Sequence, residues 1–479
     1  MRLLTYHNII FISYYLLSFV FAFTVMFKEK PKNKIISAAI VFWLLTFNIY
    51  KSPVMWRKIP YIWYFRNADY MLGWFLTAVL FLVIISRIRN EEKLPIPNFE
   101  KYFYIYIFFC LGMIGFHFFI GNITGYKASS LIRLYVNSFL LYYTFKFFMT
   151  KELIRMIFWA VIYMGIVTAV ASIYQFFIDT EFFRIGYFHM AFPGHNRSSG
   201  IFYYAYDNGL FQILALYTTV YFLKDWRVKI PLIAIFVITL ILVFTRGTWI
   251  SFIIVLLFHL TYYYGKEFKK ILTTIAIIAG LITLITGAYF AQEEFFTGAY
   301  TERVKSDTVT VRMTFYYFVL KAIPERLFTG YGDVENNDVY FKGMVNAEQS
   351  LFWALGKAGG IHNLFLEEAF LRGIFSPIIL SMVFISFFFF TVKMSTKTKN
   401  YIFCIPGYFN TGLFFYFMSV SGFLISRSSV LSLLMFGIVS GIYYNKLDIS
   451  DILIKSKFNE FNSLNTKTES QNKNGIANS

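Results

Sequence analysis

The sequence predicts an all-α, polytopic membrane protein with about 12–13 transmembrane helices and one long extracytoplasmic loop. Of its 479 residues, 58% are hydrophobic and 22% aromatic, whereas only 15% are charged. An average globular protein carries roughly 25% charged residues, so this much apolar surface requires a lipid bilayer. Two further observations agree: a series of long apolar runs, and the placement of basic residues in the gaps between them.

The apolar runs follow one another along most of the chain. Each holds roughly seventeen to twenty-five residues, which is enough for a helix that crosses the hydrocarbon core. The second run is short, and an interfacial or re-entrant placement would reduce the total from about thirteen to about twelve. The runs lie at about 7–27, 35–50, 70–86, 102–121, 131–149, 154–178, 201–223, 228–245, 248–264, 271–291, 374–392, 401–425 and 428–444.

Basic clusters mark alternate loops, and the excess of Lys and Arg in cytoplasmic loops assigns those loops to the cytoplasm. This topology accounts for the net charge of +18, so no nucleic-acid partner is expected. The loops at about 179–200 and 292–360 then both face outward, although the basic loop at 51–68 falls on that face too. The clusters predicted to be cytoplasmic lie at 28–34, 87–93, 146–155, 224–229, 266–270 and 393–399.

These features divide the chain into five parts. The tail is rich in Asn, Ser and Lys with few apolar residues, so we expect it to be disordered in the cytoplasm. The parts are N-terminal transmembrane helices (1–178), transmembrane helices with Arg-bearing extracytoplasmic ends (179–291), the long extracytoplasmic loop (292–360), C-terminal transmembrane helices (361–445) and the tail (446–479).

His362 is the candidate general base. It follows Gly359, Gly360 and Ile361 at the end of the long loop and precedes Asn363. A histidine titrates near neutrality, so it can accept a proton and return it at physiological pH. The alternative is an interfacial polar residue without a chemical role. The two glycines let the backbone approach a ligand and place His362 and Asn363 at the mouth of a helix.

Three arginines on the predicted outer face are candidates for anion binding. Arg246 stands between two apolar runs with almost no loop, so it either snorkels to the headgroups or faces a water-filled cavity and an anion. Arg197 begins another span from the same face, and Arg312 lies in the long loop. Converging guanidiniums would suit a diphosphate, because their fixed fork of donors matches phosphate oxygens.

Common catalytic motifs are missing from the sequence. It contains no Gly-x-x-x-x-Gly-Lys-Ser/Thr loop, no His-Glu-x-x-His motif and no Gly-x-Ser-x-Gly elbow. Nucleotide hydrolysis, zinc proteolysis and serine hydrolysis therefore lose their usual support. The acidic residues of the long loop are not spaced as a metal cage, so we predict neither a metal nor a cofactor.

Four motifs occur in order in the second half of the chain, and together they resemble the O-antigen ligase and polymerase family of bacterial envelope glycosyltransferases. The likeness runs from about Arg197 to the last span. Two positions depart from the family pattern: Asp207 stands before Asn208 where Pro is usual, and Ser376 differs from the ligases. The motifs are Arg197-Ser-Ser-Gly-Ile-Phe with downstream Asn208, Thr245-Arg-Gly-Thr-Trp, Arg312 through Pro324 to Gly330-Tyr-Gly, and His362-Asn363 with Gly373 nine residues on.

The resemblance implies a GT-C-like fold in the bacterial cytoplasmic (inner) membrane, with the active site on the periplasmic face. The donor would be a glycan on a polyprenyl diphosphate, such as undecaprenyl diphosphate, and the acceptor a hydroxyl of a second glycan or of a lipid A core, in lipopolysaccharide or other polysaccharide synthesis. In that reaction His362 would deprotonate the acceptor and the anomeric centre would invert. Arg197, Arg246, Arg312 and Asn363 would bind the diphosphate donor without a metal.

Two other functions remain open at this point. A lipid-linked oligosaccharide flippase would also have about a dozen helices and basic residues, but it should show repeated halves and charge near the bilayer midplane. A protein O-oligosaccharyltransferase would carry the same motifs. The polar residues of this chain gather instead at span ends and in one asymmetric loop, which favours an enzyme over a transporter.

Overall fold

The computed structural model describes residues 6–29, 33–46, 95–184, 190–192, 195–202, 204–264, 316, 319–332, 363–398, 400–418, 427–449 and 452. The predicted site residues Arg312 and His362 lie outside these residues. So do the spans expected at about 70–86 and 271–291, most of the long loop and most of the tail.

Helices form almost all of the described chain, which confirms the all-α expectation. They are α1 (Tyr6–Lys28), α2 (Lys34–Thr46), α5 (Asn98–Phe119), α6 (Gly125–Phe148), α7 (Lys151–Phe177), α8 (Ala205–Phe222), α9 (Trp226–Leu242), α10 (Arg246–Tyr264), α16 (Leu364–Arg372), α17 (Phe375–Thr398), α18 (Cys404–Tyr416) and α19 (Arg427–Tyr444). Two 3-10 turns, η2 (Ile323–Arg326) and η3 (Tyr401–Phe403), complete them.

The helices follow the predicted apolar runs closely. Three of them, α5, α7 and α17, are long and apolar enough to cross a membrane by length and composition, and four shorter apolar helices accompany them. Helix α2 has only 13 residues. At 1.5 Å per residue it covers roughly 20 Å of a hydrocarbon core that is about 30 Å thick, consistent with the short second run.

Two elements depart from a simple series of spans. Helix α16 is a separate nine-residue helix. Its C-cap residue is Gly373, and the φ of 80° at this glycine ends the helix before α17 begins. Strands β1 (Met190–Phe192) and β2 (His195–Asn196) form a small antiparallel hairpin within the loop expected at about 179–200. Neither element has the length of a span, and both lie near the candidate site.

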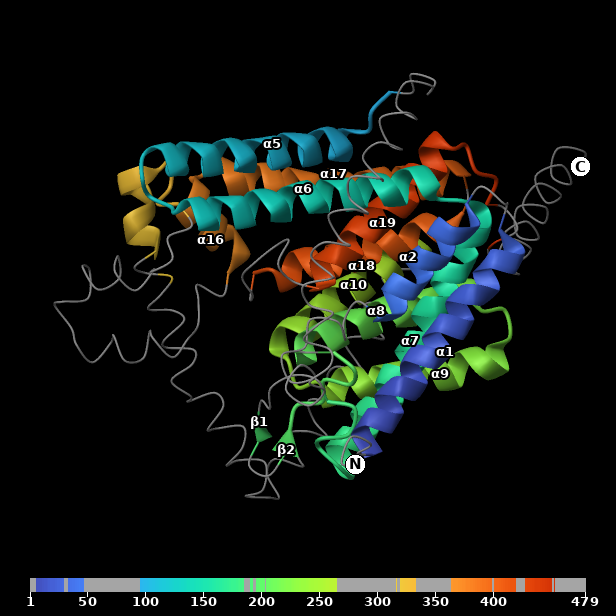
Figure 1. Cartoon of the computed structure of the whole chain (residues 1–479). Helices are drawn as coiled ribbons and strands as arrows, with labels where there is room; N and C mark the ends of the chain where they lie inside the picture. Colours follow the sequence, from blue (N-terminus) through green and yellow to red (C-terminus); the bar gives the residue numbers. More distant parts are fainter. Residues whose placement is uncertain are drawn as a thin grey trace, which may run out of the picture.

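Helices α8 and α18 occupy the interior of the bundle (Figure 1). Helix α18 packs against α8, α10, α17 and α19, and α8 packs also against α7 and α9. All residues of α8 except Tyr206 and Val220 are buried or nearly so. A helix that is buried on every side needs no polar face, which explains why its apolar residues show little helical periodicity.

Glycines let two pairs of helices approach closely. A Cβ added to Gly437 of α19 would lie 2.3 Å from the Cβ of Phe145 on α6. A Cβ on Gly209 of α8 would lie 2.4 Å from Cγ2 of Thr248 on α10. Small residues at such crossings are typical of membrane helices, because packing rather than the hydrophobic effect drives their association.

The loops with basic clusters meet at one end of the bundle. Thr150 of the 146–155 cluster donates a hydrogen bond to Glu29 of the 28–34 cluster. Asn445, which follows the last helix, donates to the Met149 carbonyl over 2.9 Å. The described parts of these two clusters and the start of the tail therefore lie together, and the opposite end carries the candidate site.

The outer surface of the bundle is strongly apolar. Large apolar side chains of α1 point outward although water would not tolerate so many of them together. A lipid bilayer is the environment that accepts such a surface, so this chain is a membrane protein. The residues of α1 that are at least 46% exposed include Ile12, Leu16, Leu17, Phe19, Val20, Phe23 and Phe27.

Candidate functional site

The segment that carries Arg197 is held by the buried side chain of Gln175 near the end of α7. Its Oε1 accepts hydrogen bonds from the Ser199 amide (3.0 Å) and the Gly200 amide (2.9 Å), and its Nε2 donates to the Gly200 carbonyl (2.8 Å). Gly200 has a φ of 56°, and a Cβ there would lie 2.1 Å from Oγ1 of Thr168. The glycine of the Arg-x-x-Gly motif is therefore required for this tight turn.

Asn208, the downstream residue of the same motif, joins α8 to α7. Its Nδ2 donates to Oγ of Ser172 (2.8 Å), and its Oδ1 accepts from Nε2 of Gln212 (3.2 Å). Ser198 adds a hydrogen bond from its hydroxyl to the Ser172 carbonyl (2.9 Å). Because all of these groups are buried, the network fixes the backbone next to Arg197.

The structure brings Arg197 and the turn before Arg246 to the same end of the bundle. The Ser198 amide donates to the carbonyl of Leu242, the last residue of α9, over 3.2 Å. Arg246 is the first residue of α10, only four positions after Leu242. The backbone segments next to Arg197 and Arg246 thus lie close together, and anion binding by the two arginines stays a prediction.

The Thr-Arg-Gly-x-Trp motif orients Arg246 outward. Trp249 donates from Nε1 to the Leu240 carbonyl (2.7 Å), and Thr248 is buried against Gly209. Arg246 itself is exposed, and no hydrogen bond or ion pair joins its guanidinium to another described residue. It stands at the N-terminus of α10, where the helix dipole also favours an anion.

Arg184 is a further cation at this end, and sequence analysis did not select it. It is 8% exposed and donates to the carbonyls of Thr180 (2.6 Å) and Arg197 (3.1 Å). Burial lowers the pKa of its guanidinium to about 10, so the side chain stays cationic at neutral pH. Nothing in its sequence neighbourhood distinguishes it from an ordinary loop arginine.

Asn363 caps α16. Its Oδ1 accepts hydrogen bonds from the amides of Phe365 (3.0 Å) and Leu366 (3.1 Å). The Leu364 amide donates to the Phe417 carbonyl at the end of α18 (2.9 Å), which fixes where α16 begins. Donor binding by Asn363 stays a prediction, and its oxygen already has this capping role.

The described segment of the long loop, residues 319–332, docks on α16. The amides of Tyr331 and Gly332 donate to the carbonyls of Phe370 (2.8 Å) and Leu371 (2.9 Å). Gly332 has a φ of 79°, which favours glycine at this position of the Gly-x-Gly motif. The Tyr331 hydroxyl donates to Oε2 of Glu325 over 2.8 Å.

His117 of α5 holds the same loop from the first half of the chain. Its Nε2 lies 2.8 Å from the Thr329 carbonyl and its Nδ1 lies 3.1 Å from Nδ2 of Asn122. These contacts correspond to a neutral ring that donates from Nε2 and accepts at Nδ1. Sequence reasoning missed His117, because only the tertiary structure places it against a residue 212 positions away.

A buried ion pair within α16 is joined to α17 by a hydrogen bond from Ser376. Arg372 donates to Oε1 of Glu368 over 2.6 Å, and Ser376 donates to Oε2 over 2.5 Å. Ser376 is one of the two positions at which the sequence departs from the ligase pattern. Its hydroxyl here satisfies the second oxygen of a buried carboxylate, which gives the departure a structural account.

Fold and site together define a helical membrane protein with Arg184 and Arg246 at one end of its bundle and with residues 319–332 of the long loop docked on α16. Residues 231–381 match the family model described as O-antigen ligase, which confirms the family resemblance. The matched segment includes Arg246, Arg312, His362 and Asn363 but begins after Arg197. The match supports a role of the O-antigen ligase or polymerase type in surface polysaccharide synthesis. No curated protein matches the chain.

Proposed function

We propose that this protein transfers a glycan from a polyprenyl diphosphate to a hydroxyl of an acceptor at the outer face of the cytoplasmic membrane. The observation that carries the proposal is the O-antigen ligase match over residues 231–381, which contains an exposed Arg246. The Ser198–Leu242 hydrogen bond supports it, because it puts Arg197 at the same end of the bundle. A charged site at a helix end facing one side of the membrane suits a lipid-linked anionic donor.

In the proposed reaction, the acceptor hydroxyl attacks the anomeric carbon of the donor sugar. His362 takes the hydroxyl proton as the new carbon–oxygen bond forms, and the bond from the anomeric carbon to the diphosphate breaks on the opposite side. Attack from that side inverts the anomeric configuration. The polyprenyl diphosphate leaves with the electron pair of the broken bond.

Arginines would stabilise the negative charge that develops on the leaving diphosphate. Arg246 contributes a guanidinium with its donors free of described protein groups, at a helix N-terminus. Arg197 and Arg312 are the proposed partners, and Arg184 would keep the Arg197 backbone in place through its hydrogen bond. Fixed guanidiniums can neutralise a diphosphate as a metal ion otherwise would, so the proposal needs no metal.

The test is glycan transfer in a strain that lacks the gene and carries the wild type, His362→Ala or Arg246→Ala at matched membrane levels. Arg227→Ala is the control, because Arg227 is an exposed arginine at the opposite end of α9. We expect both site variants to abolish or strongly reduce transfer and the control to retain it. Full transfer by His362→Ala would refute the general-base role.

The products separate the candidate functions. Single repeat units on surface lipid indicate loss of a polymerase, and long lipid-linked chains without an acceptor indicate loss of a ligase. Loss of glycan from a protein acceptor indicates an O-oligosaccharyltransferase. Accumulation of unextended donor on the cytoplasmic side alone would instead support a flippase and overturn the proposal.

A further inference from the structure

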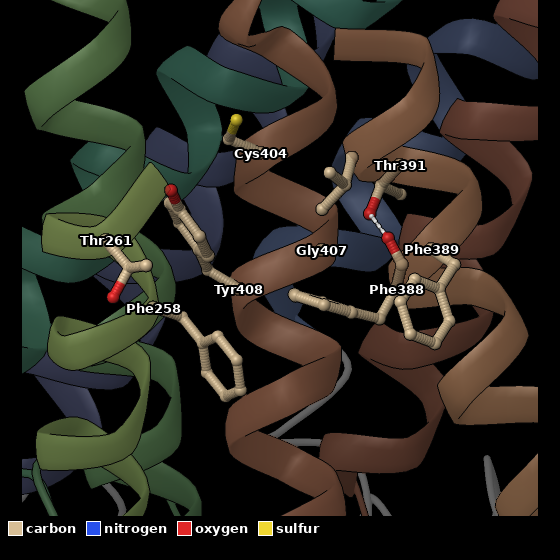
Figure 2. A pocket seen from close by; sticks show the side chains of 9 residues that line it. Phe258, Thr261, Phe388, Phe389, Thr391, Cys404, Gly407 and Tyr408 are labelled. Atoms are coloured by element: carbon tan, nitrogen blue, oxygen red, sulfur yellow. Dashed lines mark hydrogen bonds between the residues drawn. The ribbon is translucent and has the colours of Figure 1, made fainter. Parts of the chain in front are cut away.

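An apolar cavity of about 320 Å³ lies between α10, α17 and α18, away from the candidate site. Helices α10 and α17 each pack along α18, and they meet each other where the rings of Phe258 and Phe388 lie 5.1 Å apart. Figure 2 shows Phe258 and Thr261 of α10 on one side, residues of α17 on the other, and Tyr408 of α18 between them. The cavity is thus a groove between two helices with α18 as its floor.

The walls of the cavity offer almost nothing for water to bind. The hydroxyl of Thr261 donates to the Leu257 carbonyl (2.7 Å), and that of Thr391 to the Phe388 carbonyl (2.8 Å). The Cys404 thiol is paired with Ser395 over 3.4 Å. A buried water needs two to four polar partners, so this cavity is suited to a hydrocarbon chain and not to water.

The groove opens toward the lipid-facing surface. Phe389 of α17 is 64% exposed and Phe258 of α10 is 37% exposed. Phe389 continues a row of exposed apolar residues at intervals of three and four along α17, which faces the bilayer. The other members of the row are Phe375, Ile378, Met382 and Ile385.

The same face of α17 becomes basic one turn beyond Phe389. Lys393 and Lys397 are exposed, four and eight residues after Phe389, and α17 contains no acidic residue. At 1.5 Å per residue, the two lysines lie roughly 6 and 12 Å further along the axis than Phe389. That is where the boundary between hydrocarbon and headgroups would fall, at the end of the bundle where the basic loops meet.

We propose that this groove binds one anionic phospholipid, with an acyl chain in the cavity and its phosphate on Lys393 and Lys397. An apolar groove that opens to the bilayer, next to two exposed cations on the same helix, matches the two chemically different parts of such a lipid. The site lies at the end of the bundle opposite the candidate catalytic site, so it is independent of the glycan donor.

The experiment measures lipid binding to the purified full-length chain by native mass spectrometry. Detergent-solubilised protein is titrated with phosphatidylglycerol and, separately, with phosphatidylcholine that has the same chains. We expect the wild type to retain one phosphatidylglycerol in preference to phosphatidylcholine. Equal binding of the two lipids would overturn the proposal, as would retention of a polyprenyl phosphate in their place.

Two variants test the two parts of the site separately. Lys393→Gln and Lys397→Gln should each weaken phosphatidylglycerol binding about fivefold, since a lysine near an anionic surface contributes about 1 kcal/mol, and should weaken phosphatidylcholine binding less, because choline offsets the charge of its phosphate. Thr261→Phe should fill the cavity and weaken both lipids. Unchanged phosphatidylglycerol binding in the lysine variants, or unchanged binding in Thr261→Phe, refutes the corresponding contact and with it the proposed site.

Matched controls come from α1. Lys28→Gln removes an exposed lysine from the last turn of another helix at the same end of the bundle. Thr24→Phe enlarges an exposed threonine whose hydroxyl, like that of Thr261, bonds a carbonyl of its own helix. Both controls should bind lipid as the wild type does. A loss equal to that of the groove variants would mean that the effect is general and would overturn the proposal.

Discussion

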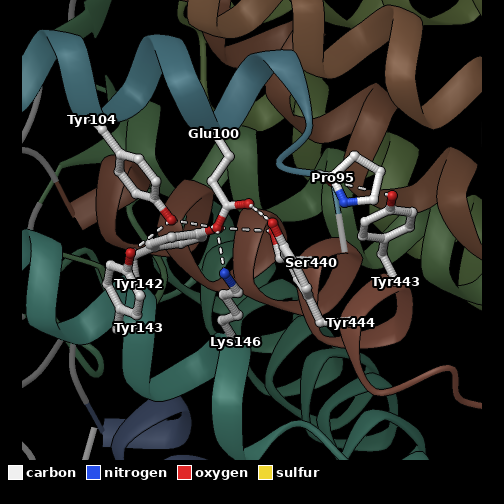
Figure 3. Close-up of polar contacts among 9 residues, drawn as sticks. All are labelled: Pro95, Glu100, Tyr104, Tyr142, Tyr143, Lys146, Ser440, Tyr443 and Tyr444. Atoms are coloured by element: carbon white, nitrogen blue, oxygen red, sulfur yellow. Dashed lines mark hydrogen bonds and ion pairs between the residues drawn. The ribbon is translucent and has the colours of Figure 1, made fainter. Parts of the chain in front are cut away.

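Glu100 is the most heavily bonded buried charge among the described residues, and replacing it should destabilise the bundle strongly. The carboxylate is fully buried. Its Oε1 accepts from Tyr104 (2.5 Å), Tyr142 (2.5 Å) and the ammonium of Lys146 (2.7 Å), and its Oε2 from Tyr444 (2.7 Å). Figure 3 shows these groups converging from α5, α6 and α19. One carboxylate therefore joins three helices.

The expected cost follows from what each substitution leaves behind. Glu100→Gln keeps the shape and an oxygen acceptor but removes the negative charge, so the buried Lys146 ammonium loses the counter-ion that it has among the described residues and keeps its contacts with aromatic rings, such as that of Tyr444 at 3.7 Å. Removing one partner of a buried ion pair costs about 3–5 kcal/mol, and we expect this variant near the upper end. Lys146→Met leaves a carboxylate that keeps three tyrosine donors, so its cost should be nearer about 3 kcal/mol.

The double variant Glu100→Gln/Lys146→Met separates pairing from packing. With both charges gone, no uncompensated charge remains, so the double variant should lose clearly less than the sum of the single losses. The assay is the free energy of unfolding in lipid–detergent micelles at constant pH. Glu152→Gln is the control, because its pair with Arg155 is about one-third exposed and such surface pairs contribute about 0–1 kcal/mol.

Two results would refute this reasoning. A loss for Glu100→Gln no larger than that of Glu152→Gln would mean that burial does not strengthen the interaction. Strict additivity in the double variant would mean that Glu100 and Lys146 do not act as a pair.

Three further substitutions test the candidate site. Asn363→Ala should lower the free energy of unfolding by about 0.5–2 kcal/mol, because the helix cap is lost. Asn363→Asp should keep the cap but reduce glycan transfer, because the added charge repels a diphosphate. Normal transfer by Asn363→Asp would mean that Asn363 acts only as a cap. Gly209→Val should lower the free energy of unfolding by about 1–3 kcal/mol, because the added side chain collides with Thr248. Adding Thr248→Ala to this variant should recover part of the loss. An unchanged free energy of unfolding in Gly209→Val would contradict the close packing of α8 on α10. Arg184→Met should lower glycan transfer at normal membrane abundance, because the Arg197 carbonyl loses its hydrogen bond. Arg184→Lys should show the same loss, because one ammonium cannot replace the guanidinium that donates to two carbonyls. Full activity of either variant would exclude this positioning role.

Much of the helical architecture was predictable because a membrane span is a local property of the chain. The run at about 7–27 corresponds to α1 at Tyr6–Lys28, and the run at about 154–178 to α7 at Lys151–Phe177. Hydropathy works here because the bilayer imposes one length and one composition on every span. The shared end of Arg197 and Arg246 was also expected, since alternating topology alone assigns both to one face.

Other parts of the site were beyond reach of sequence patterns. Gln175 clamps the Arg197 segment, and His117 holds the long loop across 212 positions, but neither carries a local signal. Helix α16 was not among the predicted apolar runs, because its nine residues include Glu367, Glu368 and Arg372 and are too few and too polar to form a span. Arg312 and His362 lie outside the described residues, so their place in the site stays a prediction.

The sequence by itself determined which segments enter the membrane, on which ends the chemistry-bearing residues lie, and the family to which its motifs point. Each follows from composition, spacing or charge within a short stretch of chain. Only the tertiary structure decided which buried polar groups pair, as in the convergence on Glu100 or the clamp at Gln175. Such pairing depends on which helices become neighbours, and that is set by packing between segments far apart in the sequence.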